Sequence, residues 1–316
     1  MMGCGQLALA CVLDLLAGDP RIFPHPVRGM GRTALILEWT TRRWIPFPMA
    51  AGAVTTLGLI AITGSCAWGV LWILREIHPL LEMGGSVYLV YTCVSIRGLF
   101  DESRPVADYL LAGRLDKARQ SLSQIVGRDT DNLNESQILR AAVETVAENT
   151  VDGIVAPLFY ACLGGPVAAL VYKAINTLDS LFGYRNETYE WFGKFPARLD
   201  DAANWIPARL GGGVMVLASW ICGLKGSGAW LIMLRDGGKH PSPNAGIPEG
   251  VMAGSLGVRL GGPSNYKGMR VEKPYIGDHL RDIEIQDIHR CHDTMWVTSL
   301  ISLLLFEGFY LGMKII

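Results

Sequence analysis

The sequence has few charged residues and no excess of either sign of charge. Only 18% of its 316 residues are Asp, Glu, Lys or Arg, against about 25% in a typical soluble domain. The 28 basic and 29 acidic residues nearly cancel, so nothing favours a polyanion, and we expect no nucleic-acid partner. Half of the residues are apolar, which excludes a disordered chain. This composition favours a membrane protein over a water-soluble enzyme.

Common site motifs are missing as well. The seven Cys residues include no CxxC pair and lie singly, mostly in apolar runs, which indicates neither a disulfide framework nor a zinc site. No P-loop motif, no GxGxxG between a strand and a helix, no GxSxG and no HExxH occurs. The sequence therefore predicts no standard nucleotide, serine-hydrolase or zinc-protease site. Any ATP that the protein uses must be held by a nonstandard arrangement.

Long apolar runs predict an all-α, polytopic integral membrane bundle that forms a single domain over residues 1–316. A membrane-spanning helix needs about 20 apolar residues. The run at 2–18 lacks the basic start and small-residue cleavage site of a signal peptide, so we expect a retained helix. The run near the carboxyl end is interrupted only by Glu307. The predicted spans are residues 2–18, 47–74, 83–96 and 295–313.

Two further apolar stretches, 154–182 and 206–234, are interrupted by glycine. The first contains Gly164-Gly165-Pro166, and the second contains Gly211 to Gly213 and Gly226-Ser227-Gly228. Each stretch is either one span or a broken, re-entrant hairpin of two short helices. Broken helices at membrane depth often mark sites, because irregular backbone needs protein or a water-filled cavity around it. Ordinary helices with glycine packing faces are the alternative.

Polar segments separate these runs and carry most of the charge. Seven Lys and Arg residues lie between Arg97 and Arg140, and five Arg residues lie between Arg21 and Arg43. The positive-inside rule places such loops in the cytoplasm. We therefore expect a multi-pass protein of the cell (inner) membrane, with the amino terminus outside. The expected cytoplasmic, partly helical segments are 19–46, 97–153, 183–205 and 235–293.

Three acidic clusters lie beside predicted membrane entries. Glu144, Glu148 and Asp152 follow at intervals of four residues, which places them on one face of a helix. Mg²⁺ takes oxygen ligands from carboxylates and substrate phosphates, so this face is a candidate metal site. A solvated helix face with Arg140 beside Glu144 is the alternative.

The second cluster lies near the end of the stretch 154–182, and the third lies just before the stretch 206–234. Asn176 and Asp179 lie one helical turn apart directly after apolar residues. Ionisable groups at the edge of a membrane segment are costly, which makes them functional candidates. Asp200 and Asp201 lie between Arg198 and Arg209, although pairing of Arg with Asp at a helix start explains these residues equally well.

A loop rich in proline and glycine differs from these clusters. Between Asp236 and Glu249 it holds three prolines and several donors, Lys239, His240, Ser242 and Asn244. Restricted backbone, close approach at glycine and clustered donors suit phosphate or carboxylate binding. The stretch from Arg259 to Tyr266 has the same character. An earlier loop contains His25 and Arg28, and His25 there fits a turn-packing role as well as a base.

Five strings together resemble the CbiB/CobD family of cobalamin biosynthesis. They are GDPRIFPHPVRGMGR from Gly18, AAVETVAENTVDGIVAPLFY from Ala141, KAINTLDSLFGYRNE from Lys173, RLDDAANWIPARL from Arg198 and KHPSPNAGIPEGVMAGSLGVRLGGP from Lys239. The resemblance runs over most of the chain, and the strings occur in the family's order. Leu181 stands where the family often has Met, and residues 47–75 and 269–293 carry nothing distinctive.

This resemblance implies an integral membrane amide-forming enzyme, adenosylcobinamide-phosphate synthase. Such an enzyme joins (R)-1-aminopropan-2-ol, or its O-phosphate, to the free propionate carboxylate of adenosylcobyric acid. The resemblance implies ATP and Mg²⁺ as requirements, with ADP and phosphate as products. A carboxylate is a poor acylating agent, so we expect transient phosphorylation to an acyl phosphate and attack by the amine. The lipid bilayer and the membrane-bound cobalamin synthase are the expected partners.

Chemistry assigns roles to the candidate residues. His240 is the candidate general base for the amine, and Asn176 and Asn244 are candidates for orienting the carboxylate. Mg²⁺ is assigned to the six carboxylates Glu144, Glu148, Asp152, Asp179, Asp200 and Asp201. Phosphate and substrate binding is assigned to Lys239, Arg185, Arg198, Arg209, Arg259, Ser242, His25 and Arg28.

Two other classes remain open on the residues alone. Membrane prenyltransferases and alcohol phosphotransferases also hold Mg²⁺-diphosphate on acidic stripes, but their DDxxD and DGxxAR patterns are absent in strict form. A related membrane family senses and regulates cell-wall antibiotic resistance without catalysis. Such a regulator has no need of the loop from Lys239 to Glu249, so that loop favours the synthase.

Overall fold

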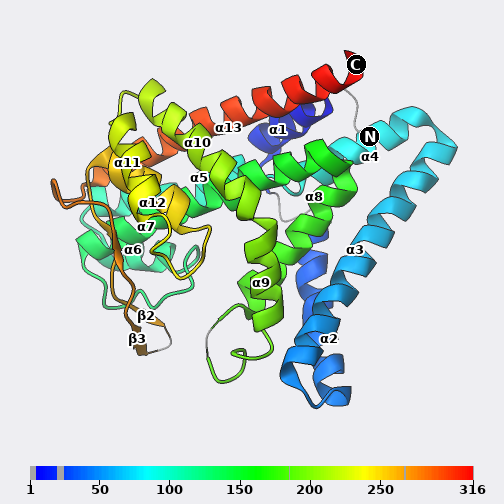
Figure 1. Ribbon diagram of the computed structural model, residues 1–316, viewed down its shortest axis with the longest axis horizontal. Coiled ribbons are helices and arrows are strands. Elements are labelled where there is room, and N and C mark those ends of the chain that lie inside the picture. The colour runs from blue at the N-terminus through cyan, green and yellow to red at the C-terminus, as the bar shows by residue number, and fades with distance from the viewer. Residues whose placement is uncertain (1–4, 20–24, 185, 267, 316) are drawn as a thin grey trace. The chain divides into compact units, whose positions relative to one another are not determined.

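The computed structural model describes residues 5–19, 25–184, 186–266 and 268–315, and it is mostly helical (Figure 1). The helices are α1 (Gln6–Ala17), α2 (Pro26–Trp44), α3 (Pro48–Ile77), α4 (Pro79–Tyr91), α5 (Ile96–Leu111), α6 (Leu115–Leu122), α7 (Glu135–Thr150), a π-helical turn η1 (Val151–Val155), α8 (Ala156–Phe182), α9 (Lys194–Ala203), α10 (Trp205–Ile221), α11 (Gly226–Asp236), α12 (Gly246–Leu256) and α13 (Ile285–Ile315). Four short strands, β1 (Leu260–Gly261), β2 (Ser264–Tyr266), β3 (Met269–Val271) and β4 (Tyr275–Ile276), form the antiparallel pairs β1–β4 and β2–β3. Sequence periodicity did not predict these strands.

The chain folds into two compact units. Unit 1 comprises residues 1–95, 156–204 and 303–316, and unit 2 comprises residues 96–155 and 205–302. Each unit has its own buried residues, for example Leu59 and Leu178 in unit 1 and Ile138 and Met252 in unit 2.

Among the residues that the structure describes, four helical stretches are long and apolar enough to cross a membrane: 48–77, 79–111, 135–182 and 285–312. In the most apolar 18-residue window of α3, only 17% is buried, and Trp68 and Trp72 expose more than half of their surface. A helix that exposes so much apolar surface needs lipid or protein around it. These features confirm the predicted all-α, multi-pass membrane fold. The shorter apolar helices Gln6–Ala17 and Trp205–Ile221 accompany these four.

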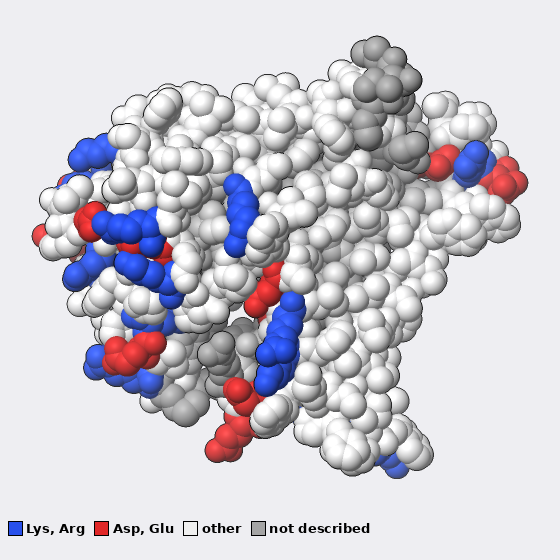
Figure 2. Space-filling view, viewed as in Figure 1, with Lys and Arg blue, Asp and Glu red and all other residues white. Residues whose placement is uncertain are grey.

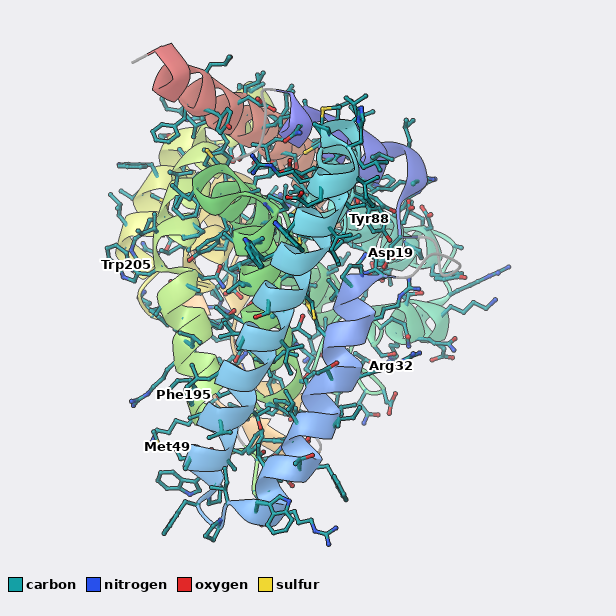
Figure 3. All side chains as sticks on the ribbon, turned by 90° about the vertical axis from the view of Figure 1, so that its right-hand side faces the viewer. Asp19, Arg32, Met49, Tyr88, Phe195 and Trp205 are labelled. Carbon is teal, nitrogen blue, oxygen red and sulfur yellow. The ribbon has the colours of Figure 1, made fainter. Side chains whose placement is uncertain are left out.

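Within unit 1, α2 and α3 lie side by side, joined by a short turn (Figure 3). At the start of α3, Gly52 packs directly on the backbone near Phe192, since a Cβ there would lie 2.0 Å from the Phe192 carbonyl oxygen. Glu307 interrupts the apolar run of α13 for a structural reason. Its carboxylate accepts hydrogen bonds from the Gly5 and Ala8 amides at 3.1 and 3.2 Å, which caps the amino terminus of α1.

The two glycine-interrupted stretches break in different ways. In α8 the backbone leaves helical geometry at Gly164 and Gly165, so of the alternatives left open for this stretch the interrupted helix holds. The second stretch breaks at residues 222–225, between α10 and α11, where Gly223 has a φ of +73°. At Gly211 to Gly213 the alternative of an ordinary helix with glycine packing faces holds. Those glycines lie inside α10, where Gly211 packs on Val151 and Gly212 packs on Ile247.

In unit 2, α11 and α12 pack at very close range. A Cβ at Gly254 would lie 2.2 Å from the Gly228 carbonyl oxygen, and one at Gly228 would lie 2.6 Å from the Gly254 oxygen. Small residues permit this approach of two backbones, as in membrane helix pairs. The helix α12, which is buried along its whole length, is therefore held rigidly beside α11.

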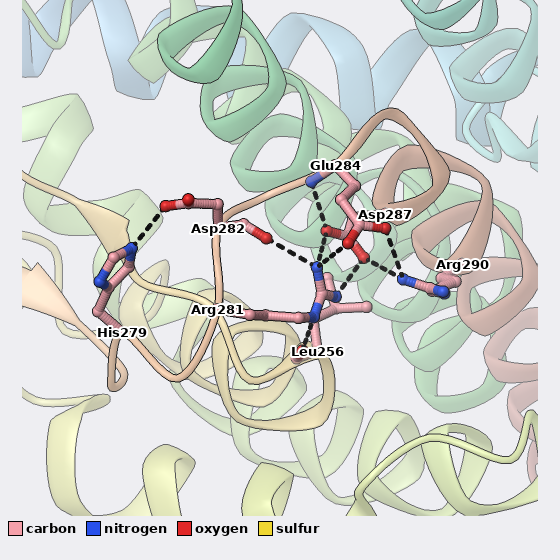
Figure 4. A network of polar contacts seen from close by, with 7 residues as sticks. All are labelled: Leu256, His279, Arg281, Asp282, Glu284, Asp287 and Arg290. Atoms are coloured by element: carbon pink, nitrogen blue, oxygen red, sulfur yellow. Dashed lines mark hydrogen bonds and ion pairs between the residues drawn. The ribbon is translucent and has the colours of Figure 1, made fainter.

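A buried aspartate anchors the start of α13 in unit 2 (Figure 4). The Asp287 carboxylate, which has no exposed surface, accepts hydrogen bonds from Arg281 at 2.6 and 2.8 Å and from Arg290 at 2.8 Å. It also accepts the Glu284 amide at 2.9 Å. Arg281 in turn donates to the Leu256 carbonyl oxygen at 3.1 Å. This network ties the end of α12 to α13.

Candidate functional site

Charged side chains gather in a few patches, while most of the surface visible in the space-filling view is uncharged (Figure 2). Unit 2 holds a group of buried and half-buried ionisable residues around α7, α12 and the short strands. We call Glu144, Glu148 and Glu249 the acid cluster. Glu144 and Glu148 lie on α7, and Glu249 lies on the neighbouring helix α12.

Both carboxylate oxygens of Glu144 accept hydrogen bonds from protein groups. Arg128 donates to Glu144 Oε2 at 2.5 Å, and the Gly261 amide donates to Oε1 at 2.6 Å. The side chains of Arg128 and Glu144 are 15% and 4% exposed. A carboxylate with both oxygens engaged in this way holds the β1 segment against α7. In this structure Glu144 is therefore a structural anchor and not an available metal ligand.

Glu249 is the most unusual member of the acid cluster. Its side chain is 6% exposed, and its Oε2 atom has no hydrogen-bond partner among the residues that the structure describes. Burial and the charges of Glu144 and Glu148 raise the pKa of Glu249 well above its ordinary value, against the opposing charges of Lys273 and Arg128. A buried carboxyl with an unsatisfied oxygen is costly, which marks it as a functional candidate.

Sequence reasoning missed Glu249, Arg128, Lys273 and Arg140. Glu249 follows Pro248 in the proline-rich loop. The hydrogen-bond donors of that loop predicted anion binding, which gave Glu249 no role. The signal that points to Glu249 is its place as the one charged residue of the otherwise apolar helix α12, where an acidic residue is costly.

His240 lies beside Glu249 with a defined ring orientation. Its Nδ1 accepts the Ser242 amide at 3.0 Å, and its Nε2 lies 4.0 Å from Glu249 Oε1. Burial and the positive charges of Lys273 and Arg128 lower the pKa of His240 to about 4. The ring is therefore neutral near pH 7 and carries its proton on Nε2. This arrangement favours His240 as a hydrogen-bond donor over the predicted role of general base.

Lys239 has a partner of its own. Its ammonium lies 2.6 Å from Asp236, which is buried and also accepts hydrogen bonds from Arg235 at 2.7 and 2.8 Å and from the Gly277 amide at 2.9 Å. The hydrogen bonds from Arg235 and Lys239 hold the pKa of Asp236 well below its usual range. Lys239 thus helps to neutralise a buried carboxylate at the end of α11.

Two arginines converge on one aromatic ring next to the acid cluster. The guanidinium carbons of Arg259 and Arg140 lie 4.1 and 5.7 Å from the centre of the Tyr275 ring. Arg140 also donates to the Gly261 carbonyl oxygen at 3.2 Å, and its buried Nε has no partner among the described residues. We call Arg140 and Arg259 the basic pair. Gly261 links the two groups, since its amide binds Glu144 and its carbonyl binds Arg140.

The other predicted loop residues contact one another. Arg209 donates to Asn244 Oδ1 at 3.3 Å and to the Trp205 carbonyl oxygen at 2.8 Å. The Asn244 amide donates to Ser242 Oγ at 3.3 Å. Asn244 is buried, so its contact with Arg209 fixes the loop onto α10.

Unit 1 contains a second buried polar group. Asp200 on α9 accepts hydrogen bonds from Asn204 at 3.0 Å and from Asn176 at 3.5 Å. Asn204 accepts the Tyr172 hydroxyl at 2.9 Å. The structure thus brings Asn176 and Asp200 together, which the sequence analysis did not anticipate. Asp179 on α8 and Asp201 on α9 are half-buried.

The remaining predicted residues lie apart from these groups. In unit 1, Arg28 donates to Asp19 at 2.9 Å, and His25 Nε2 lies 3.6 Å from Asp19. Burial lowers the pKa of His25. Arg198 is exposed on α9, and Asp152 lies in the π-helical turn, so it does not continue the regular helix of Glu144 and Glu148. Arg185 lies outside the described residues.

The predicted magnesium ligands do not converge in the described part of the chain, where no group of three His, Cys, Asp or Glu residues has metal-binding geometry. Both oxygens of Glu144 are taken, and Asp200 accepts two amide hydrogen bonds. These residues are therefore a poor fit for a magnesium ion that is held mainly by protein carboxylates. The assignment of Mg²⁺ stays a prediction.

Comparisons with known proteins identify the family. The family model "CobD/Cbib protein" matches residues 7–295. The cobalamin biosynthesis protein CobD of Geobacter metallireducens is 50% identical over 90% of both chains, and that of Klebsiella pneumoniae is 48% identical over 95% of both. The cobalamin biosynthesis protein CbiB of Salmonella choleraesuis is 46% identical over 97% of both. No solved structure matches the chain. The chain belongs to the CobD/CbiB family of cobalamin biosynthesis proteins.

Proposed function

We propose that the protein is adenosylcobinamide-phosphate synthase. It joins (R)-1-aminopropan-2-ol, or its O-phosphate, to the free propionate of adenosylcobyric acid, and ATP is converted to ADP and phosphate. The observation that carries this proposal is the acid cluster with its unsatisfied Glu249 oxygen beside the basic pair of Arg140 and Arg259. An amide-forming site must accommodate both a cationic amine and anionic carboxylate and phosphate groups, and unit 2 offers a region of each sign.

The basic pair is the proposed anion-binding side. Guanidinium groups bind carboxylate and phosphate in bidentate fashion. Stacking on Tyr275 limits the motion of Arg259, which is exposed to solvent. The unpartnered Nε of Arg140 leaves a donor in the same region. We assign these two side chains to the propionate carboxylate and to the phosphoryl group that it receives.

The reaction proceeds in two steps in this proposal. The propionate attacks the γ-phosphate of ATP, which gives an acyl phosphate and ADP, and the amine then displaces phosphate from the acyl carbon. Cationic side chains neutralise charge that develops during phosphoryl transfer. We propose that Mg²⁺ enters with ATP, because Mg²⁺ commonly binds through substrate phosphates with one or two carboxylates.

The membrane location follows from the same proposal. The four candidate spans anchor the protein in a bilayer, and we place it in the cell (inner) membrane with the polar segments of unit 2 in the cytoplasm, where ATP is available. The membrane-bound cobalamin synthase is the proposed partner that receives the product.

A growth experiment tests the proposed function. A strain that lacks this protein is expected to grow with cobinamide but not with adenosylcobyric acid, and the intact chain should restore growth on the latter. Arg259→Met is expected to restore growth poorly. The matched control Arg270→Met, which alters an exposed arginine paired with Glu272, should restore it fully. Growth of the deletion strain on adenosylcobyric acid would contradict the proposal.

A further inference from the structure

The acid cluster holds more acidic groups than the cationic side chains that act on it. Its three carboxylates face two cations, Arg128 and Lys273, among the described residues that act on Glu249. Arg128 forms an ion pair with Glu144, and the Lys273 ammonium donates to the Tyr266 hydroxyl at 2.8 Å. With all three carboxyl groups ionised, the cluster carries one more negative charge than these two side chains supply in positive charge.

The unsatisfied position is a single oxygen atom. Glu249 Oε2 is buried and has no partner among the described residues, while Oε1 faces His240 Nε2 at 4.0 Å. The neutral ring of His240 gives this face a hydrogen-bond donor without adding a charge. In its ionised form, a buried carboxylate of this kind is stabilised by a cation with hydrogen-bond donors.

A primary ammonium ion matches these requirements. It carries one positive charge, and its three N–H groups can reach Glu249 Oε2 and a second acceptor. Mg²⁺ matches them less well, because it demands near-octahedral oxygen coordination and no three acidic, His or Cys side chains of the described chain gather for it.

We infer that Glu249 binds the ammonium group of the amine substrate and removes one of its protons, with Glu148 as the second carboxylate of this subsite. This inference rests on the proposed function. It assigns the acceptor subsite to the acid cluster and separates it from the anion-binding basic pair.

The proton and electron balance is simple. One ammonium proton passes to Glu249, and the nitrogen lone pair then forms the C–N bond to the acyl carbon. The bond from that carbon to the phosphate oxygen breaks, and the second proton leaves nitrogen with the departing phosphate. Glu249 finally releases its proton to solvent. Glu144, Glu148, Lys273, Arg128 and His240 are the charged and titratable groups that set the proton affinity of Glu249 in the described chain.

A choice of nucleophile tests the inference. Hydroxylamine is largely neutral near pH 7, so it attacks an acyl phosphate without a protein base. For Glu249→Gln in purified, reconstituted protein, we expect kcat/KM with 1-aminopropan-2-ol to fall about 10²- to 10⁴-fold near pH 7, the usual contribution of a general base. Hydroxamate formation from adenosylcobyric acid, ATP and hydroxylamine should stay within about twofold of wild type.

Further readouts separate a catalytic role from a structural one. Raising the pH should recover amide formation by Glu249→Gln, because solvent then deprotonates the amine. Glu272→Gln, at an exposed position in the same unit, should match wild type with both nucleophiles. Wild-type turnover of the amine by Glu249→Gln, or an equal loss with both nucleophiles, would overturn the inference.

A binding measurement distinguishes the occupant independently of turnover. Saturating 1-aminopropan-2-ol should raise the melting temperature of wild type but not of Glu249→Gln. A Glu249-dependent rise with Mg²⁺ alone, and none with the amine, would identify a metal site and overturn the inference. If the wild type binds the amine but forms neither amide nor hydroxamate with ATP, the proposed function fails while the ammonium site stands.

Discussion

Arg128 and Glu144 form a buried ion pair at 2.5 Å, and Glu144 also accepts the Gly261 amide at 2.6 Å. The pair joins the segment before α7 to the short strand β1. It therefore determines where the basic pair lies relative to the acid cluster within unit 2. Removing one partner leaves an uncompensated charge in a buried position.

We predict that Arg128→Met destabilises the protein by about 3–5 kcal/mol, because breaking a buried pair leaves Glu144 without a counter-charge. Chemical denaturation in detergent measures the free energy of unfolding. Arg270→Met, which breaks an exposed pair with Glu272, should cost under about 1 kcal/mol. Equal stability of Arg128→Met and wild type would show that the pair is not essential to unit 2.

Gly254 sets the distance between α11 and α12. A Cβ there would lie 2.2 Å from the Gly228 carbonyl oxygen, so Gly254→Ala should force the helices apart at a cost of about 1–3 kcal/mol. Thermal unfolding measures the effect. Gly213→Ala in α10, where no atom lies within 4 Å of the added Cβ, should be neutral or stabilising by about 0.5–1 kcal/mol. Similar melting temperatures for both variants would refute the close packing.

Asp236 contributes stability that depends on pH. Its hydrogen bonds with Arg235 and Lys239 lower its pKa when folded, so its contribution is complete above the unfolded pKa of about 3.9. This contribution is lost as the pH falls through the folded value. Asp236→Asn should therefore lower the melting temperature near pH 7, and the difference from wild type should shrink below about pH 4.

A matched variant checks that result. Asp282→Asn changes an exposed aspartate paired with His279 and should leave the melting temperature almost unchanged near pH 7. A difference between wild type and Asp236→Asn that is constant from neutral to acid pH would contradict the assigned ionic contacts of Asp236.

Asp200 organises the polar group of unit 1. Asp200→Ala removes the acceptor of the Asn204 amide, which is 1% exposed, and should cost about 1–3 kcal/mol for a buried unsatisfied donor. Asp200→Asn keeps one acceptor and should cost less. Glu190→Ala, at an exposed position of the same unit, serves as the control. A stability of Asp200→Ala equal to that of the control would exclude a structural role for these contacts.

The sequence was sufficient for the membrane class and for the acidic helix of Glu144 and Glu148, because apolar length and helical spacing are local properties. The break at Gly164 was also predictable, since glycine followed by proline interrupts a helix. The sequence alone could not decide between a break and packing glycines at Gly211 to Gly213, because the close packing on Val151 and Ile247 is a tertiary contact.

The sequence predicted only part of the candidate site, because the other part depends on tertiary contacts. Glu249 meets Glu144 only because α12 packs on α7, more than a hundred residues away in the chain. Arg128 and Lys273 lie in connecting segments without any motif, and nothing local marks their long-range partners. The sequence predicted that Lys239 binds phosphate, yet in the structure its ammonium forms an ion pair with Asp236, three residues earlier.

The most direct measurement is an assay of the purified chain in nanodiscs with adenosylcobyric acid, Mg²⁺-ATP and either 1-aminopropan-2-ol or its O-phosphate. We predict an amide product of the expected mass with one of the two acceptors, together with ADP and phosphate in equal amounts to the amide. ATP-independent amide formation, or no amide from folded protein with either acceptor, would contradict the account.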